Sequence, residues 1–145
     1  MLTKKIIWGL LVFVMTTILG TTSLQAEPFD GYTLFNPNDS RITTLINMDN
    51  QVQHTWNHDR NGGYAVYLLK NGNLLRPASV SNPRLRGGAY AGLIQEKDWD
   101  NNLVWEFEYS SATYITHHDL EPMPNGNVLA IAWEVKSAAE GAQAG

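Results

Sequence analysis

The sequence predicts an all-β fold built from short strands and tight turns, and three observations indicate it. Short runs rich in Val, Ile, Leu, Tyr and Trp are separated by turn-forming pairs such as Asn-Gly, Asp-Asn and Gly-Gly. That pattern is typical of strands joined by tight turns. Helix signals are few after residue 26, and the order of runs and turns occurs twice along the chain. We therefore expect antiparallel β-sheet over most of the chain.

The first of the two repeated units contains four predicted strands. They cover residues 43–48, 52–56, 64–69 and 74–76. Turns are predicted at Asp49-Asn50, which closes a hairpin, and at Asn71-Gly72-Asn73.

The second unit repeats this order. Its predicted strands cover residues 92–99, 103–109, 118–123 and 128–135, with turns at 100–102 and 125–127. Asp49 matches Asp100 at a spacing of 51 residues, and the two Asn-Gly-Asn turns are 54 residues apart. A self-similar unit of about 50 residues with about four strands is typical of a β-propeller blade. The alternative is a two-sheet sandwich whose hairpins are similar by chance.

The number of units predicts an incomplete ring. Residues 30–135 hold about two blades, whereas closed propellers have at least four. The Ala- and Gly-rich segment 137–145 is typical of the start of a helical loop rather than of a closing strand. We therefore expect residues 27–145 to be the N-terminal portion of a longer, truncated propeller. Its open face and unpaired edges favour aggregation or assembly, including formation of a homo-oligomer.

The first 26 residues have the three parts of a signal peptide. Lys4 and Lys5 precede an apolar stretch over residues 6–19, and a small residue, Ala26, stands at the expected cleavage site. The stretch is shorter than a spanning helix requires, although an uncleaved membrane anchor is the alternative. Export to the periplasm is expected, with no stable membrane span after cleavage. The absence of cysteine fits that compartment and excludes disulfides and thiol chemistry.

The charge of the chain argues against a nucleic-acid partner. The formal net charge is −4 and no basic stripe is present. Loss of Lys4 and Lys5 with the signal peptide makes the remaining chain more acidic. A protein that binds nucleic acid needs clustered Lys and Arg to neutralise phosphates, so the acidity is interpreted as a contribution to solubility.

The sequence His117-His118-Asp119 is the main candidate for chemistry. An imidazole acts near neutral pH as a base, a nucleophile or a hydrogen-bond donor to an oxyanion. In a regular strand His117 and His118 would point to opposite faces, and Asp119 would share the face of His117. The structural alternative is a polar strand end with satisfied hydrogen bonds. His54 and His58 are four residues apart, but they lie at a strand end rather than on a helix, so no metal site is expected.

The second unit resembles the bacterial arylsulfotransferase family. The similar segments are residues 92–100 (GLIQEKDWD), 103–107 (LVWEF) and 117–129 (HHDLEPMPNGNVL), together with 67–73 (YLLKNGN) in the first unit. The resemblance covers residues 30–140, and the segment with the paired histidines is its most specific part. It implies a periplasmic, six-bladed propeller. Such enzymes transfer a sulfuryl group from a phenolic sulfate ester to a phenol through a histidine intermediate, without a cofactor.

The resemblance assigns site residues as follows. His118 is the first choice and His117 the second for a catalytic histidine that contacts sulfate in a central channel. Asp119 would orient an imidazole and complete substrate binding. The nucleophilic histidine and the principal arginine of the family belong to later blades, which implies that this chain alone is inactive. A non-catalytic binding propeller is the main alternative. A quinone-binding propeller is a further alternative, but the sequence shows no set of calcium or quinone ligands that would favour it.

Overall fold

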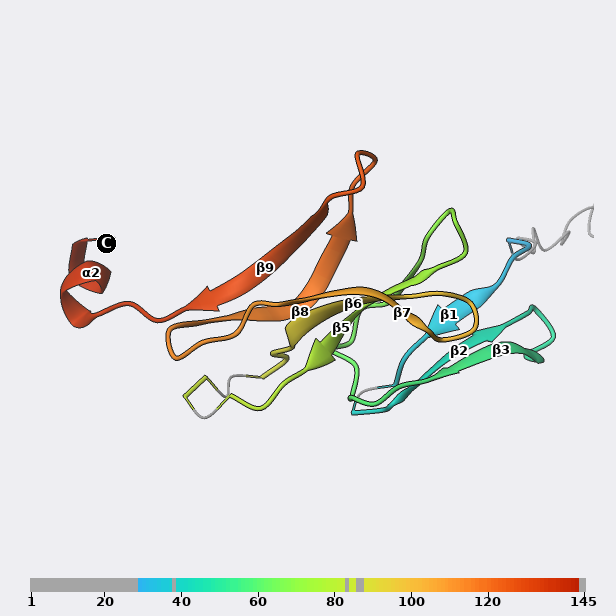
Figure 1. Cartoon of the computed structure of the whole chain (residues 1–145), viewed down its shortest axis with the longest axis horizontal. Coiled ribbons are helices and arrows are strands. Elements are labelled where there is room, and N and C mark those ends of the chain that lie inside the picture. Colours follow the sequence, from blue (N-terminus) through green and yellow to red (C-terminus); the bar gives the residue numbers. More distant parts are fainter. Residues whose placement is uncertain (1–28, 38, 83, 86–87, 144–145) are drawn as a thin grey trace, which may run out of the picture.

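The described part of the chain consists almost entirely of antiparallel β-sheet (Figure 1). The structure is a computed structural model that describes residues 29–37, 39–82, 84–85 and 88–143. These residues form three sheets, and one short helix, α2 (Ala138–Gln143), follows the last strand. The prediction of an all-β fold is confirmed. The predicted signal peptide, residues 1–26, lies outside the described residues. Within the described ranges, no helix has the length and apolar character needed to cross a membrane.

The three sheets follow one another along the chain. The first contains β1 (Thr33–Phe35), β2 (Ile42–Ile46) and β3 (Val52–Asn57) in that order, and β1 is a strand that the sequence pattern did not predict. The second is a four-stranded meander of β4 (Tyr67–Leu68), β5 (Leu74–Ser79), β6 (Gly92–Lys97) and β7 (Leu103–Glu108). The third contains β8 (Tyr114–Pro122) and β9 (Val128–Glu134).

The repeat extends to individual strand pairs in the hairpins β2–β3 and β6–β7. Thr43 pairs with Trp56, and the residues 51 positions later, Ile94 and Phe107, also pair. Both hairpins have a register irregularity at the corresponding step, one residue before the strand ends. Asn50 and its counterpart Asn101 both have positive φ, at 60° and 69°, because Asn tolerates the left-handed region at a turn.

The hairpins β4–β5 and β8–β9 repeat with the spacing of 54 residues. Leu68 pairs with Leu74, and Pro122 pairs with Val128. In the two Asn-Gly-Asn turns, the glycine φ values are 86° and 85°, and each glycine N–H donates to the carbonyl three residues earlier, at 2.9 and 3.0 Å. Glycine favours this conformation because it has no Cβ.

The sheets do not coincide with the units that the sequence predicted. The predicted units ran from 43 to 76 and from 92 to 135, but β5 pairs with β6 along its full length, from Leu74 opposite Lys97 to Ser79 opposite Gly92. The second sheet therefore joins the later half of one unit to the earlier half of the next. A fixed spacing defines the length of a repeat but not the point at which one sheet ends and another begins.

The second sheet is covered on both faces. Leu74 of β5 packs with Leu45 and Trp56 of the first sheet, whereas the next residue, Leu75, packs with Ile94 and with Leu120 of the third sheet. Successive residues of a strand point to opposite faces, so this leucine pair connects two cores. Three sheets stacked in series do not form a two-sheet sandwich.

Substitution of glycine is expected to have very different costs at two positions that share a positive φ. Gly126 has open space around the position of a Cβ, so Gly126→Ala should destabilise the fold by about 1 kcal/mol, the cost of the backbone conformation alone. At Gly92 a Cβ would lie 2.3 Å from a methyl of Val80 and 3.2 Å from Ile115. Gly92→Ala should therefore cost clearly more, as measured by urea unfolding. Equal losses for the two variants would contradict the packing described here.

Candidate functional site

The paired histidines lie where the β8–β9 ladder is interrupted. Pairing stops at Thr116 and resumes at Leu120, so residues 117–119 of β8 lie opposite a single residue of β9, Ile131. Such a bulge bends its strand and changes the direction of its side chains, and bulges are frequent beside active sites. The residue types around the bulge do not predict it, because they are ones that also occur in regular strands.

The two imidazoles contact each other instead of pointing to opposite faces. Their ring centroids are 4.3 Å apart with an interplanar angle of 67°, and the Nδ1 atoms of His117 and His118 are hydrogen-bonded to each other. Both side chains are partly exposed. The expected alternation across a regular strand is wrong at this point because the bulge removes the regular pleat.

Aromatic rings flank the histidine pair on two sides. Trp133 of β9 is edge-on to His117 at a centroid distance of 5.2 Å. Tyr64, which belongs to the segment before β4, is edge-on to His118 at 5.7 Å. Tyr64 precedes His118 by 54 residues, so corresponding positions of neighbouring sheets meet here. The site therefore lies at the junction of the second and third sheets.

Tyr64 holds its ring beside His118 from an unusual backbone conformation. Its φ is 83°, a region that bulky residues rarely occupy and that costs on the order of 1–3 kcal/mol. Strained residues of this kind cluster at binding and catalytic sites, where the surrounding structure maintains them. The strain at Tyr64 is thus a second indication that this junction is more than a packing contact.

Asp119 contacts a tyrosine rather than an imidazole. Its Oδ1 accepts hydrogen bonds from the Tyr67 hydroxyl at 3.3 Å and from the Leu120 N–H at 2.9 Å. Burial, followed by the negative charge of Asp119, raises the pKa of Tyr67. Within the described residues Asp119 forms no hydrogen bond to His117 or His118, so the expected orienting contact is not present. The bulge places the carboxylate over β4 instead.

Arg76 is the most deeply buried cation among the described residues, and it lies on the other side of the second sheet. Its side chain is fully buried and shares the face of Leu74 on β5. Nη1 donates to Gln95 at 2.7 Å and Nη2 donates to the Arg60 carbonyl at 2.9 Å. Burial lowers its pKa to about 10, so Arg76 remains charged at neutral pH. It faces the first sheet, so it does not contribute charge to the histidine pair.

The other two histidines have structural roles. His54 stacks on Trp99 at 4.1 Å, and its Nε2 lies 2.8 Å from the Trp99 carbonyl oxygen. His58 is buried, with Nε2 2.9 Å from the Thr43 hydroxyl. Burial first, and then the charges of Arg76 and Lys97, lower the pKa of His58 to about 3. Across the described part of the chain, no three His, Asp or Glu side chains are grouped as metal ligands.

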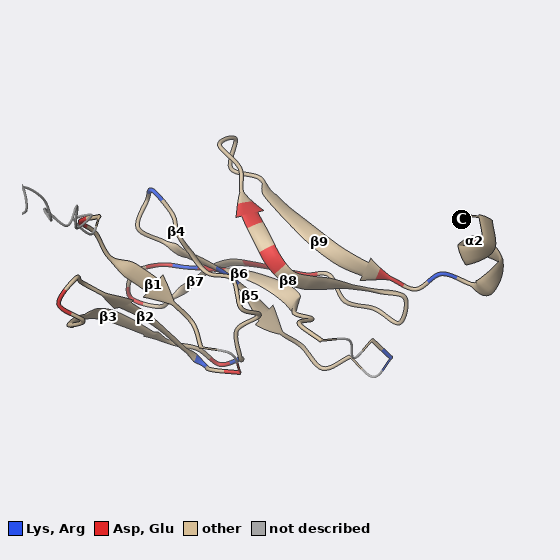
Figure 2. Ribbon diagram, turned by 180° about the vertical axis from the view of Figure 1, so that it is seen from behind, with Lys and Arg blue, Asp and Glu red and all other residues tan. Residues whose placement is uncertain are grey.

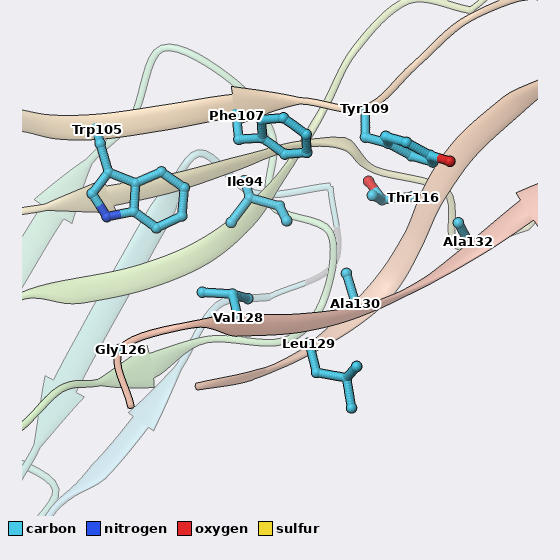
Figure 3. A pocket seen from close by; sticks show the side chains of 10 residues that line it. All are labelled: Ile94, Trp105, Phe107, Tyr109, Thr116, Gly126, Val128, Leu129, Ala130 and Ala132. Carbon is cyan, nitrogen blue, oxygen red and sulfur yellow. The ribbon is translucent and has the colours of Figure 1, made fainter. Parts of the chain in front are cut away.

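An apolar groove of about 480 Å³ lies beside the third sheet (Figure 3). Trp105 and Phe107 of β7 and the following Tyr109 form one wall, and Val128 and Ala130 of β9 form the other. Neither imidazole lines the groove. The exposed residues Asp119 and Glu121 on β8 give this strand an acidic surface (Figure 2).

Comparison of the sequence with protein-family models and curated proteins, and of the fold with solved structures, found no match.

The sequence indicated His117, His118 and Asp119 as one cluster, but it did not indicate their aromatic neighbours. Tyr64 and Tyr67 lie in the preceding unit, and Trp133 lies on the strand that pairs with β8. A signal for Tyr64 was available in the spacing of 54 residues, which makes it the counterpart of His118. Nothing in the sequence indicated Trp133, because its contact depends on the bulge.

The buried His58 is expected to make stability depend on pH between 7 and 5. Its pKa is about 3 in the folded protein and about 6.5 when the chain is unfolded, so in this range the unfolded state binds the additional proton. The free energy of unfolding should therefore fall as the pH is lowered. Substitution His58→Asn should flatten this dependence, as measured by urea unfolding at several pH values. An unchanged dependence in the variant would show that His58 is not buried in its neutral form.

Proposed function

We propose that this chain forms part of a β-propeller aryl-sulfate sulfotransferase, in which His118 and His117 contact the sulfuryl group. The observation that carries the proposal is the pair of partly exposed imidazoles that a strand bulge brings together beside the strained Tyr64. The resemblance of residues 92–129 to arylsulfotransferases supports it. Residues 1–26 would direct the chain to the periplasm as a cleaved signal peptide.

The strand arrangement supports a propeller. Its blades are antiparallel sheets arranged around a central channel, so one edge strand of each sheet faces that channel. β4 and β8 are corresponding strands, and each lies at an edge of its sheet. The contact of Tyr64 with His118 joins these two edges. In a closed ring β8 would thus present the histidine pair to the channel.

The chemistry requires donors around the sulfate oxygens and a nucleophile in line with the leaving group. In the first step a histidine nitrogen attacks sulfur, the bond from sulfur to the aryl oxygen breaks, and the leaving phenolate takes the proton from the other nitrogen of the same imidazole. In the second step the acceptor phenol gives its proton back to that nitrogen, its oxygen attacks sulfur, and the bond from sulfur to the histidine breaks. Positioning and charge stabilisation dominate transfers of this type, which suits two adjacent imidazoles that donate hydrogen bonds.

Asp119 contributes to substrate binding through its affinity for a phenol. The Tyr67 side chain is itself a phenol, and its hydroxyl donates to Oδ1 of Asp119 at 3.3 Å. An acceptor phenol would make the same hydrogen bond, and the rings of Tyr64 and Trp133 would pack against its aromatic ring. The proposed substrates are thus a phenolic sulfate ester and a phenol, without a cofactor.

One observation favours a non-catalytic binding module as the second candidate. Among the described residues no Lys or Arg forms an ion pair or a hydrogen bond at the histidine pair, whereas Asp119 and Glu121 lie close by in β8. A sulfate ester is bound more weakly where carboxylates outnumber cations. Turnover also needs a cation that stabilises the charge on the transferring sulfuryl group. The chain alone should therefore bind an aryl sulfate without turning it over.

In a titration with 4-nitrophenyl sulfate, the imidazole NMR signals of His118 and His117 are expected to shift at lower ligand concentrations than those of His54 and His58. Loss of a charge-assisted hydrogen bond is worth about 1.5–3 kcal/mol, so His118→Ala should weaken binding by about tenfold or more. His54→Ala, which removes a histidine at the other sheet junction, is the matched control and should leave affinity unchanged.

The same samples test catalysis when a phenol acceptor is added. No release of 4-nitrophenol is expected from this chain alone, because no Lys or Arg in the described part of the chain forms an ion pair or a hydrogen bond with the histidine pair. Binding that is unaffected by both His118→Ala and His117→Ala would contradict the proposed site. Turnover by the chain alone would contradict the assignment of the remaining catalytic groups to other blades.

A further inference from the structure

A polar cleft lies where the ends of the first and second sheets meet, along the connection between β3 and β4. It consists of two adjoining hollows of about 490 and 180 Å³, and Asn61, Ser79 and Tyr90 line both of them. The larger hollow alone is within the size range of small-molecule sites. Neither His117 nor His118 lines the cleft, so it is a place separate from the histidine pair.

The backbone along the cleft is held from both sheets. The Gly62 N–H donates to the Ser40 carbonyl at 3.0 Å, and the Ser79 N–H donates to the Asn61 carbonyl at 2.9 Å. These bonds fix the connection between the β1–β2 loop on one side and β5 on the other. A ligand that binds to a preformed surface of this kind loses little free energy to the ordering of the protein.

Backbone strain is concentrated at the smaller hollow. Among the described residues, five residues other than glycine have positive φ, and two of them, Asn50 and Asn101, belong to hairpin turns. The other three are Asp39 (55°), Tyr64 (83°) and Ala89 (62°), and all three line the smaller hollow. Strained residues cluster at ligand-binding sites, so this observation marks the cleft independently of its size.

Two guanidinium groups line the larger hollow, near the start of β2 and the end of β3 (Figure 2). Arg41 Nε donates to Oδ1 of Asn61 at 3.3 Å, and Arg60 Nε lies 3.6 Å from Oδ2 of Asp59. Both contacts use Nε, and within the described ranges no Nη atom of either arginine forms a hydrogen bond. Two guanidinium forks suit a tetrahedral oxyanion, because a planar carboxylate has only two oxygens to share between them.

The larger hollow has an excess of positive charge. Asp59 offsets one of its two arginines, Arg41 and Arg60. Buried Arg76 adds a third positive charge, because its Nη2 donates to the Arg60 carbonyl at 2.9 Å and the group remains charged at neutral pH. An oxyanion is therefore favoured in this part of the cleft.

The smaller hollow favours a different chemical group. It contains one carboxylate, that of Asp39, beside Tyr64, Tyr90 and the polar residues Asn61 and Ser79. A carboxylate repels an anion but accepts hydrogen bonds from hydroxyl groups, and tyrosine rings offer an apolar face together with a polar tip. A hydroxylated ligand body therefore fits here better than a second anion or a purely apolar ring.

We propose that this cleft binds a hydroxyl-rich ester of phosphate or sulfate, such as a sugar ester, with the oxyanion between Arg41 and Arg60 and hydroxyl groups on Asp39. Phosphate and sulfate esters share the tetrahedral oxyanion that the arginines recognise. The site is inferred from the cleft alone and does not depend on sulfuryl transfer at the histidine pair.

Isothermal titration calorimetry with glucose 6-phosphate and glucose 6-sulfate tests the proposed ligand class. At least one ester should bind, and the tighter of the two identifies the oxyanion that the cleft prefers. Glucose lacks the anion and the matching inorganic anion lacks the hydroxyl groups, so each should bind weaker than the ester by about tenfold or more. Absence of binding by both esters, or equal affinity for the ester and the inorganic anion, overturns the proposal.

The double variant with Arg41→Gln and Arg60→Gln should weaken binding of the tighter ester by about tenfold or more, because charge-assisted hydrogen bonds are lost. Both side chains are exposed, so the circular dichroism spectrum should be unchanged. The double variant with Lys70→Gln and Arg84→Gln is the matched control, since it removes the same charge from exposed residues outside the cleft. Equal loss of affinity in the two double variants overturns the site.

Asp39→Asn tests the smaller hollow, because Asn also tolerates the left-handed backbone region. It should weaken binding of the ester but not of the inorganic anion. In the wild-type chain, the Nε–H NMR signals of Arg41 and Arg60 should shift when the ester is added, and unchanged signals would contradict the site even if calorimetry detects binding. The affinity of the histidine pair for 4-nitrophenyl sulfate is measured separately, so the two proposals stand or fail independently.

Discussion

The structure depends on the fact that none of the three described sheets buries both of its faces by itself. Leu74 and Leu75, adjacent on β5, enter separate cores on the two sides of the second sheet. Burial of each leucine is worth roughly 1.5–3 kcal/mol, and it exists only because another sheet lies against that face. The stability of the chain is therefore a sum of contacts between neighbouring sheets, and the outermost sheets retain apolar faces that such contacts do not satisfy.

The same stacking creates the candidate site. The β8 bulge turns two imidazoles toward each other, and the adjacent sheet brings Tyr64 and Tyr67 against the bulged residues. Neither sheet supplies the full set of side chains. A site at a junction of this kind is sensitive to how the sheets are spaced, which links the strained backbone of Tyr64 to the position of His118. The alignment of corresponding edge strands thus brings the side chains of the candidate site together.

Much of this arrangement follows from sequence spacing, and the rest does not. Turn residues such as Asn50 and Gly126 predicted the hairpins because their preferred φ values are local properties. The division into sheets was predicted wrongly, since pairing of β5 with β6 depends on contacts far apart in the chain. His117 and His118 were singled out as a pair in the sequence, but their mutual contact was not predicted, because a bulge is a tertiary response to the partner strand. The roles assigned to them in sulfuryl transfer stay predictions.

The contact between Tyr64 and His118 depends both on the stacking of the second and third sheets and on the β8 bulge, so detection of this contact tests the two features together. With ring centroids 5.7 Å apart, nuclear Overhauser effects between the Tyr64 ring protons and the His118 imidazole protons are expected, alongside those between the side chains of Leu75 and Leu120. Observation of the leucine contact without the contact between Tyr64 and His118 would contradict a site at the sheet junction. Absence of both would contradict the stacking itself.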